Sequence, residues 1–289
     1  MKNIAVLLTC YNRKEKTIQS LEYLFKASEL IESNIKLSVY LTDDGSTDGT
    51  SEYVLKKFPN VTILKGSGSL FWAGGMRNSW KEAIKNNYDA YLLLNDDTNV
   101  FPNVFKELIL THEKCIEKYG SPGIYIGSTK DEESKKLSYG GAVLTNNFLF
   151  KYHFIEPNGD IQSCDLGNAN IMLVSKYTVD KIGTLSEGYL HGVADYDYTL
   201  KAVNKKIPVL ITPSFCGTCT DDHSDIYDDY HSKPLLERYK ILKNPLGLDF
   251  KSNLTLMKRH FPFRVPFVVI SAILKVLLPK IYVKGLAKR

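Results

Sequence analysis

An apolar run that ends in two adjacent carboxylates limits the fold of this chain more than any other feature. Residues 91–94 read Tyr-Leu-Leu-Leu and lead directly into Asn95, Asp96 and Asp97. A short apolar run bounded by polar residues is typical of a strand buried on both faces. Open α/β sheets bind ligands at the carboxyl ends of such strands, and a divalent cation is the usual compensation for two adjacent carboxylates. We therefore predict a site for a metal and a phosphorylated ligand here.

The same arrangement occurs upstream. Residues 39–42 read Val-Tyr-Leu-Thr and lead into Asp43 and Asp44, followed by Gly-Ser-Thr-Asp-Gly. A carboxylate at this strand end can accept a hydrogen bond from a ribose hydroxyl or a base N–H. A turn with helix caps is the alternative, because Asp, Ser, Thr and Gly favour both. That alternative explains residues 46–48 well and the two acids at the strand end less well.

The first hundred residues alternate between strand and helix patterns. This alternation predicts an α/β fold with a mostly parallel central sheet flanked by helices. Beyond Phe101 we expect one helix, several short strands, a further helix starting near Asp195, and a helical C-terminal segment from about Lys233. The expected strands are 4–9, 37–42, 61–64 and 90–94, and the expected helices are 14–31, 50–58, 76–87 and 104–119.

The net charge of +5 is unevenly distributed along the chain. From Lys251 onward there are nine Lys and Arg residues and no Asp or Glu, so the totals of 37 basic and 32 acidic residues leave 28 and 32 in the first 250. The body is therefore slightly acidic, which argues against a nucleic-acid partner. Residues 1–3 lead straight into a strand-like run without a signal-peptide pattern, so we expect a cytoplasmic protein.

The cysteines Cys10, Cys115, Cys164, Cys216 and Cys219 form no spaced framework, and their odd number fits reduced thiols. The Cys216-x-x-Cys219 spacing leaves a redox pair and a zinc site as alternatives. Its late position and the lack of a second pair favour ordinary loop cysteines.

Two further loops have residues suited to a nucleotide. Residues 9–13, Thr-Cys-Tyr-Asn-Arg, close the first strand and can present N–H groups and a hydroxyl, although an ordinary βα turn is the alternative. Residues 66–78 form a glycine-rich loop that opens a helix, where Arg77 adds a cation suited to phosphate. Trp72 in this loop either stacks on a base or sugar or covers the crevice.

Residues 9–13, 43–48, 74–78 and 95–97, in this order, resemble the family 2 glycosyltransferases of the GT-A fold over roughly residues 1–220. The resemblance implies that Asp97 holds Mn²⁺ or Mg²⁺ on the donor diphosphate and that Asp44 contacts the nucleotide. Residues 70–75 look most like the bacterial surface-polysaccharide branch that includes rhamnosyltransferases. The implied nucleotide-binding set is Thr9, Tyr11, Asn12, Arg13, Asp43, Asp44, Gly74, Arg77 and Asp96.

A second acidic motif of this family is matched by residues 192–201, which makes Asp195 the catalytic base. An acceptor hydroxyl has to lose its proton as it attacks the anomeric carbon, and a carboxylate within reach can take it. Ala194 stands where the family usually has Glu. The alternative is that Asp195 is a helix N-cap and Asp197 a first-turn charge. By the same resemblance His223 is a metal ligand, and the alternative is a surface histidine.

The resemblance implies a division into a nucleotide-binding half (1–100), an acceptor half (101–220) and a C-terminal helical extension (221–289). It also implies metal-dependent, inverting transfer from a nucleotide-diphosphate sugar to a glycan or lipid-linked acceptor. The Gln-x-x-Arg-Trp motif of processive synthases is absent, which favours single transfers. A sugar-phosphate nucleotidyltransferase is one alternative, but residues 9–13 lack its glycines. A non-catalytic nucleotide-sugar-binding or membrane scaffold protein is the other.

The C-terminal segment contains an apolar stretch, residues 261–278, that Arg264 and Lys275 interrupt. It is too short for the roughly 20 residues of a membrane span, while its basic flanks suit a helix lying on anionic lipid. We therefore expect peripheral contact with the inner face of the cell membrane. The alternative is a helix packed on the body or on a second subunit in a homodimer.

Overall fold

An eight-stranded sheet forms the centre of the computed structural model, which describes residues 1–31, 35–220, 229–280 and 282. The strand order is β11-β14-β6-β13-β4-β1-β2-β3. β1 pairs in parallel with β2 and β4, and β13 runs antiparallel to β4 and β6. The predicted α/β fold with a largely parallel sheet is confirmed. The strands are β1 (Asn3–Cys10), β2 (Lys36–Asp43), β3 (Thr62–Lys65), β4 (Ala90–Leu94), β6 (Ile124–Ile126), β11 (Gln162–Ser163), β13 (Ile171–Ser175) and β14 (Val209–Ile211).

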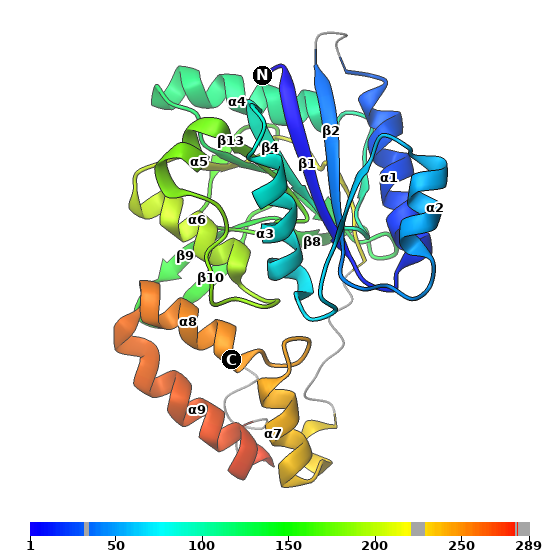
Figure 1. Cartoon of the computed structure of the whole chain (residues 1–289). Helices are drawn as coiled ribbons and strands as arrows, with labels where there is room; N and C mark the ends of the chain where they lie inside the picture. The colour runs from blue at the N-terminus through cyan, green and yellow to red at the C-terminus, as the bar shows by residue number, and fades with distance from the viewer. Residues whose placement is uncertain (32–34, 221–228, 281, 283–289) are drawn as a thin grey trace.

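Helices cover both faces of this sheet, so alternate side chains of β1 enter two different cores (Figure 1). Ile4, Val6 and Leu8 pack against α1 (Lys14–Ser28), α2 (Thr50–Lys57) and α4 (Val104–Tyr119). Ala5 and Leu7 pack against α3 (Phe71–Ala83), α5 (Lys176–Ile182) and α6 (Ala194–Asn204). Burial on both faces explains the continuous apolar runs in the sequence.

Two small sheets extend the central one. The first has the order β10-β9-β12 and the second β5-β15-β7-β8. Their strands are β5 (Asn99–Val100), β7 (Thr129–Lys130), β8 (Leu137–Tyr139), β9 (Gly141–Asn146), β10 (Lys151–Phe154), β12 (Leu166–Gly167) and β15 (Gly217–Thr218).

Cys216 and Cys219 lie in irregular backbone on either side of the two-residue strand β15, which agrees with the prediction of loop cysteines. Both are buried free thiols, and burial raises the pKa of each to about 12. Such thiols carry almost no thiolate at neutral pH, which removes the basis for a reactive redox pair.

Helix α3 begins at Phe71, so the prediction of a glycine-rich loop up to residue 75 is wrong. Gly74 and Gly75 lie inside the helix and are buried. A Cβ atom at Gly75 would lie 2.0 Å from the Thr9 hydroxyl oxygen. The glycine is therefore needed because α3 packs directly on β1, a tertiary contact that cannot be read from local sequence.

The described C-terminal residues include the helices α7 (Leu235–Lys243), α8 (Phe250–His260) and α9 (Val265–Leu277). Two short 3₁₀ turns, η1 (Tyr230–Ser232) and η2 (Pro262–Arg264), accompany them. α8 ends just before Pro262, which lacks the N–H needed to continue a helix. The predicted apolar stretch 261–278 is thus a 3₁₀ turn followed by α9. In Figure 1 these helices lie on the side of the body toward which β1 and β2 run.

Within the described part of the chain, every helix is too short or too polar to cross a membrane.

Candidate active site

The first acidic pair organises the loops at the end of β2. The Asp44 carboxylate accepts hydrogen bonds from the backbone N–H groups of Gly68 and Leu70, both at 2.8 Å, and of Phe71 at 3.0 Å. It thereby satisfies donors at the start of α3 that have no partner within the helix. Asp43 accepts from the Ser46 backbone N–H at 2.8 Å and from the Ser51 hydroxyl. Their contact with a nucleotide stays a prediction.

The loop after β1 is tied to the loop after β2. Asn12 adopts a left-handed backbone (φ 50°), and its side-chain oxygen accepts from the Thr47 N–H at 2.7 Å. The Asn12 N–H donates to the Ser46 hydroxyl at 2.9 Å. Tyr11 remains exposed beside this junction. These contacts bring the predicted residues Tyr11, Asn12 and Asp43 together at one end of the sheet.

The second acidic pair meets an arginine. The Arg13 guanidinium lies 3.3 Å from an Asp96 carboxylate oxygen and contacts Asp97 more closely still. Thr17 donates a hydrogen bond to Asp96 at 3.3 Å. Burial raises the pKa of Asp96 to about 7, while the positive charge of Arg13 acts in the opposite direction. The pair at the end of β4 therefore has a compensating cation supplied by the chain itself.

The donor set here fits a metal that is shared with a ligand. Among the residues that the structure describes, no group of three His, Cys, Asp or Glu side chains could hold a metal by itself. Asp97 is less buried than Asp96 and lines a hollow of about 110 Å³. Mg²⁺ is usually held by one or two carboxylates together with substrate phosphates, and Asp97 with a diphosphate would match that design. The predicted ligand His223 lies outside the described residues.

Trp72 fixes Asn95, the residue that precedes the second acidic pair, Asp96 and Asp97. Its indole N–H donates to the Asn95 side-chain oxygen at 2.8 Å. The indole therefore joins the start of α3 to the end of β4.

Asp195 lies in the first turn of α6. Its oxygens accept from the backbone N–H groups of Tyr196 at 2.9 Å and Ala169 at 3.3 Å. Burial raises its pKa to about 6 in spite of these bonds and of one from the Asn168 side chain. The N-cap position belongs to Val193, so the N-cap alternative for Asp195 is wrong. A carboxyl group that titrates near neutrality is suited to proton transfer.

The turn between β12 and β13 connects the two acidic sites. Ala169 bonds to Asp195, as described, and the carbonyl of Asn170 accepts from the Asn95 N–H at 3.1 Å. The Asn170 side chain donates to Cys219 at 3.3 Å, and Cys219 in turn contacts Asp97. Sequence reasoning missed this turn, although the polar run Asn168–Asn170 between two apolar segments was a usable signal.

Comparisons with known proteins identify the family of this chain. The family described as Glycosyl transferase family 2 matches residues 5–161, more than half of the 289 residues. The chain belongs to glycosyl transferase family 2. The matched range contains both acidic pairs but not Asp195.

Among solved structures, the crystal structure of S. aureus TarS 1-349 is similar to this glycosyltransferase at 17% identity and a TM-score of 0.50. The likeness covers 91% of this chain and 72% of that one, and it supports the fold. No curated protein matches the chain.

Arg77 of the glycosyltransferase contacts the segment that precedes Asp195. Its guanidinium donates to the backbone carbonyls of Ser186 and Tyr189, both at 3.0 Å, and lies 3.3 Å from the Glu187 carboxylate. Arg77 thus clamps α3 to residues 186–189. Its predicted contact with a nucleotide stays a prediction.

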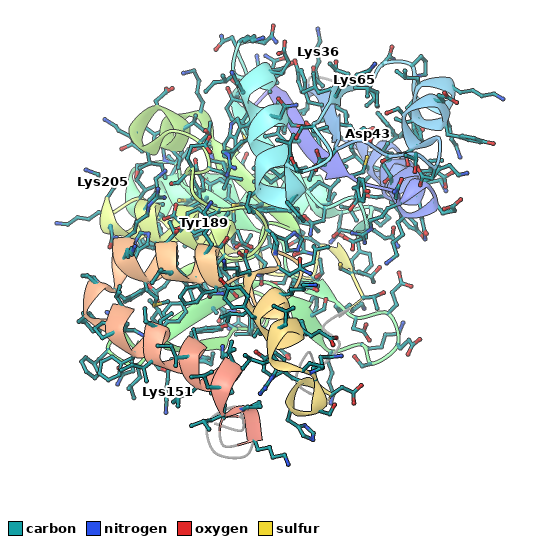
Figure 2. The ribbon with its side chains drawn as sticks, turned by 60° about the horizontal axis from the view of Figure 1, so that its bottom comes forward. Lys36, Asp43, Lys65, Lys151, Tyr189 and Lys205 are labelled. Carbon is teal, nitrogen blue, oxygen red and sulfur yellow. The ribbon has the colours of Figure 1, made fainter. Side chains whose placement is uncertain are left out.

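Asp197 anchors the C-terminal helices to α6. Its buried carboxylate contacts the Tyr189 hydroxyl and His260, both at 2.9 Å, and Arg259 at 3.4 Å. Burial alone would raise the pKa of Asp197, but the hydrogen bonds and the charge of Arg259 lower it to about 2. Asp197 lies in the first turn of α6, as the alternative predicts, and it is in addition the centre of a buried ion pair. Figure 2 labels Tyr189 at the junction with α8.

A second contact holds α8 in place. Asp249 caps α8 by accepting from the Ser252 N–H, and it also accepts from the Gly192 N–H at 3.0 Å. Gly192 lies three residues before Asp195, so α8 braces the backbone that positions the candidate base.

Proposed function

We propose that this glycosyltransferase carries out metal-dependent, inverting and non-processive transfer of a hexosyl residue. The donor is a nucleotide-diphosphate sugar, and the acceptor is a glycan or lipid-linked oligosaccharide of surface-polysaccharide assembly, as in the rhamnosyltransferase-like branch. One observation carries the proposal. Asp195 is a carboxyl group with its pKa raised to about 6, and the turn that holds it also contacts the strand end bearing Asp96 and Asp97.

The donor would lie along the loops at the carboxyl ends of β1, β2 and β4. The exposed Tyr11 ring is suited to stacking, and Asp43 and Asp44 hold the loops around it rigid. In this proposal Thr9, Asn12, Arg13, Gly74, Arg77 and Asp96 complete the nucleotide-binding set. Thr9 acts where α3 packs on β1 at Gly75, Gly74 acts through its close packing on Leu70, and Arg77 acts through its clamp on residues 186–189.

Asp97 would hold Mn²⁺ or Mg²⁺ together with the donor diphosphate. The bound metal would neutralise the negative charge that develops on the leaving group. Arg13 is placed to share this task, because its guanidinium already lies against both carboxylates.

Asp195 would take the proton of the acceptor hydroxyl. As that oxygen forms its bond to the anomeric carbon, the bond from that carbon to the diphosphate breaks, and a single displacement of this kind inverts the configuration. Ala194 cannot supply the contact of the usual Glu. The backbone N–H groups of Ala169 and Tyr196 and the Asn168 side chain orient the carboxylate instead.

Titration calorimetry with UDP, dTDP and GDP, with and without Mn²⁺, tests the donor site. We expect metal-dependent binding of one nucleotide by the wild type and its loss in Asp97→Asn. Asp180→Asn, an exposed carboxylate on α5, is the matched control. Failure of all three nucleotides to bind would contradict the proposal, whereas tight binding without turnover of any donor would favour the scaffold alternative.

The location that we propose is the cytoplasm, at the inner face of the cell membrane. The exposed apolar side of α9 and the basic C-terminal segment support this placement more than they support a homodimer.

A further inference from the structure

Helix α9 presents an exposed apolar stripe to solvent. Its members are Phe267, Ile270, Ile273 and Leu277, with exposed fractions of 59%, 54%, 51% and 56%. They recur at three- and four-residue spacing, so they lie on one face of the helix. Ala272 and Val276, on the opposite side, are buried against the rest of the protein. Solvent-exposed apolar patches of this kind usually mark an interaction surface.

The hairpin between β9 and β10 extends this stripe. The Phe148 ring stacks on Phe263 with centroids 5.3 Å apart and planes inclined by 3°. Arg264 donates to the Phe148 carbonyl at 2.8 Å, which fixes the hairpin tip to the start of α9. Phe148, Leu149 and Phe263 are all exposed. We call the set Phe148, Leu149, Phe263, Phe267, Ile270, Ile273 and Leu277 the apolar face.

A groove of about 650 Å³ opens beside the apolar face, between α9 and the helices behind it. Phe267 and Ile270 belong to both, and the deeper lining is mainly apolar, with Phe150 and Met257 among its residues. Arg264 and Lys275 are the cations of this lining. The groove therefore combines an apolar lining with two positive charges, which matches a lipid chain attached to an anionic headgroup.

The charge around the apolar face distinguishes between two possible occupants, a second copy of this chain and an anionic bilayer. From Lys251 onward the sequence holds nine basic and no acidic residues. Lys251, Lys258 and Lys280 are exposed, and so is Lys151 beside the hairpin tip, labelled in Figure 2. A second copy of this chain would bring like charges together, whereas an anionic bilayer would compensate them. A stripe from Phe263 to Leu277 is roughly 20 Å long and suits a helix lying in the interface.

We propose that the apolar face docks on a bilayer that contains anionic phospholipid, with the groove filled by a lipid chain. The docked surface is continuous, through α8, with the backbone that holds Asp195. A lipid-linked acceptor would thus reach the site from the same side. The docking itself does not depend on the proposed transfer reaction.

Co-sedimentation of the full chain with vesicles tests this proposal. Wild-type protein should sediment with phosphatidylcholine vesicles that contain phosphatidylglycerol, should bind pure phosphatidylcholine much less, and should dissociate at high salt. The double variant Ile270→Asp/Ile273→Asp should bind at least about tenfold more weakly, because two apolar side chains no longer enter the lipid. The matched control Ile84→Asp/Ile116→Asp changes two exposed isoleucines of the body, at 45% and 42%, and should bind as the wild type does.

Nucleotide titration of the same variants separates this proposal from the donor site. Ile270→Asp/Ile273→Asp should bind nucleotide normally, which also shows that the variant is folded. Absence of wild-type binding to the anionic vesicles would overturn the docking proposal and leave the donor site untouched. Equal weakening in the control variant would overturn it as well. A wild-type dimer that the double variant converts to monomer, without vesicle binding, would assign the apolar face to a second copy.

Discussion

Helix α6 has two carboxylates two residues apart whose surroundings differ in kind. The side toward the β12–β13 turn holds Asp195, which meets backbone and amide N–H donors and has its pKa raised to about 6. The side toward α8 holds Asp197, which meets His260 and Arg259 and has its pKa lowered to about 2. Both are desolvated. The difference shows that side-chain hydrogen-bond donors, His260 first, together with the charge of Arg259 outweigh burial at Asp197, whereas burial outweighs the backbone donors at Asp195.

Among the substitutions that test this comparison, Asp195→Asn should have the largest effect, and it should act on turnover. An amide cannot take the acceptor proton, so we expect turnover to fall by about 10²–10⁴ while nucleotide binding stays the same. Steady-state kinetics and calorimetry measure the two quantities. Turnover within about threefold of the wild type would show that another group is the base.

Asp197→Asn should act on stability instead. Loss of the negative charge removes the ion pair with Arg259 and weakens the contact with His260, so the unfolding free energy should fall by about 2 to 3 kcal/mol. Urea denaturation at pH 7 measures this change. Asp195→Asn is the internal control, because ionisation of Asp195 is disfavoured in the folded state and its removal should not lower stability. Equal destabilisation by both substitutions would contradict the distinction between the two sides of α6.

Asp195 and Asp197 should also act in different pH ranges, one on activity and the other on stability. The base works only when ionised, so kcat/KM should drop as the pH falls below about 6, by about tenfold per pH unit. The pKa of Asp197 is lower in the folded than in the unfolded chain. Its stabilisation is therefore complete above pH ~4 and is lost as the pH falls toward about 2. A pH–rate profile and acid denaturation curves measure the two transitions, and their coincidence would contradict the assignment.

Arg13→Gln should have the smallest effect, and it extends the comparison to a third carboxylate, Asp96. Asp96 combines burial, as at Asp195, with an arginine, as at Asp197. Removing the guanidinium frees both carboxylates for a cation, so Mn²⁺ should bind the nucleotide-free protein about three- to tenfold more tightly. Calorimetry measures the affinity, with Lys14→Gln as the neighbouring control. Weaker Mn²⁺ binding in Arg13→Gln would show that the arginine does not compete with the metal.

The sequence predicted those parts of the molecule whose signals are local. The strands before Asp43 and Asp96 follow from apolar runs that end in acids, and the alternation with helices follows from periodicity. Predictions that depend on tertiary contacts were wrong or missing. Gly75 suggests a loop by composition but lies in helix α3. It is a glycine because Thr9 on β1 leaves no space for a side chain.

The candidate site shows the same limit of prediction from local sequence. Asp195 can be found from its acidic motif, but its pKa depends on burial and on Ala169, which belongs to a distant turn. The partner of Asp197 is His260, 63 residues further along the chain. Pairing at such separations results from the whole fold, so no short pattern encodes it.

The attachment of α8 to α6 has a consequence for how the protein folds. The Asp197 ion pairs and the packing of Leu256, Met257 and Phe261 against Tyr189 and Ala194 make one shared core. The segment before Asp195 cannot reach its final arrangement until a part of the chain synthesised about 60 residues later has docked. We therefore expect the surroundings of Asp195 to be completed late in folding, when the C-terminal helices join the body of this glycosyltransferase.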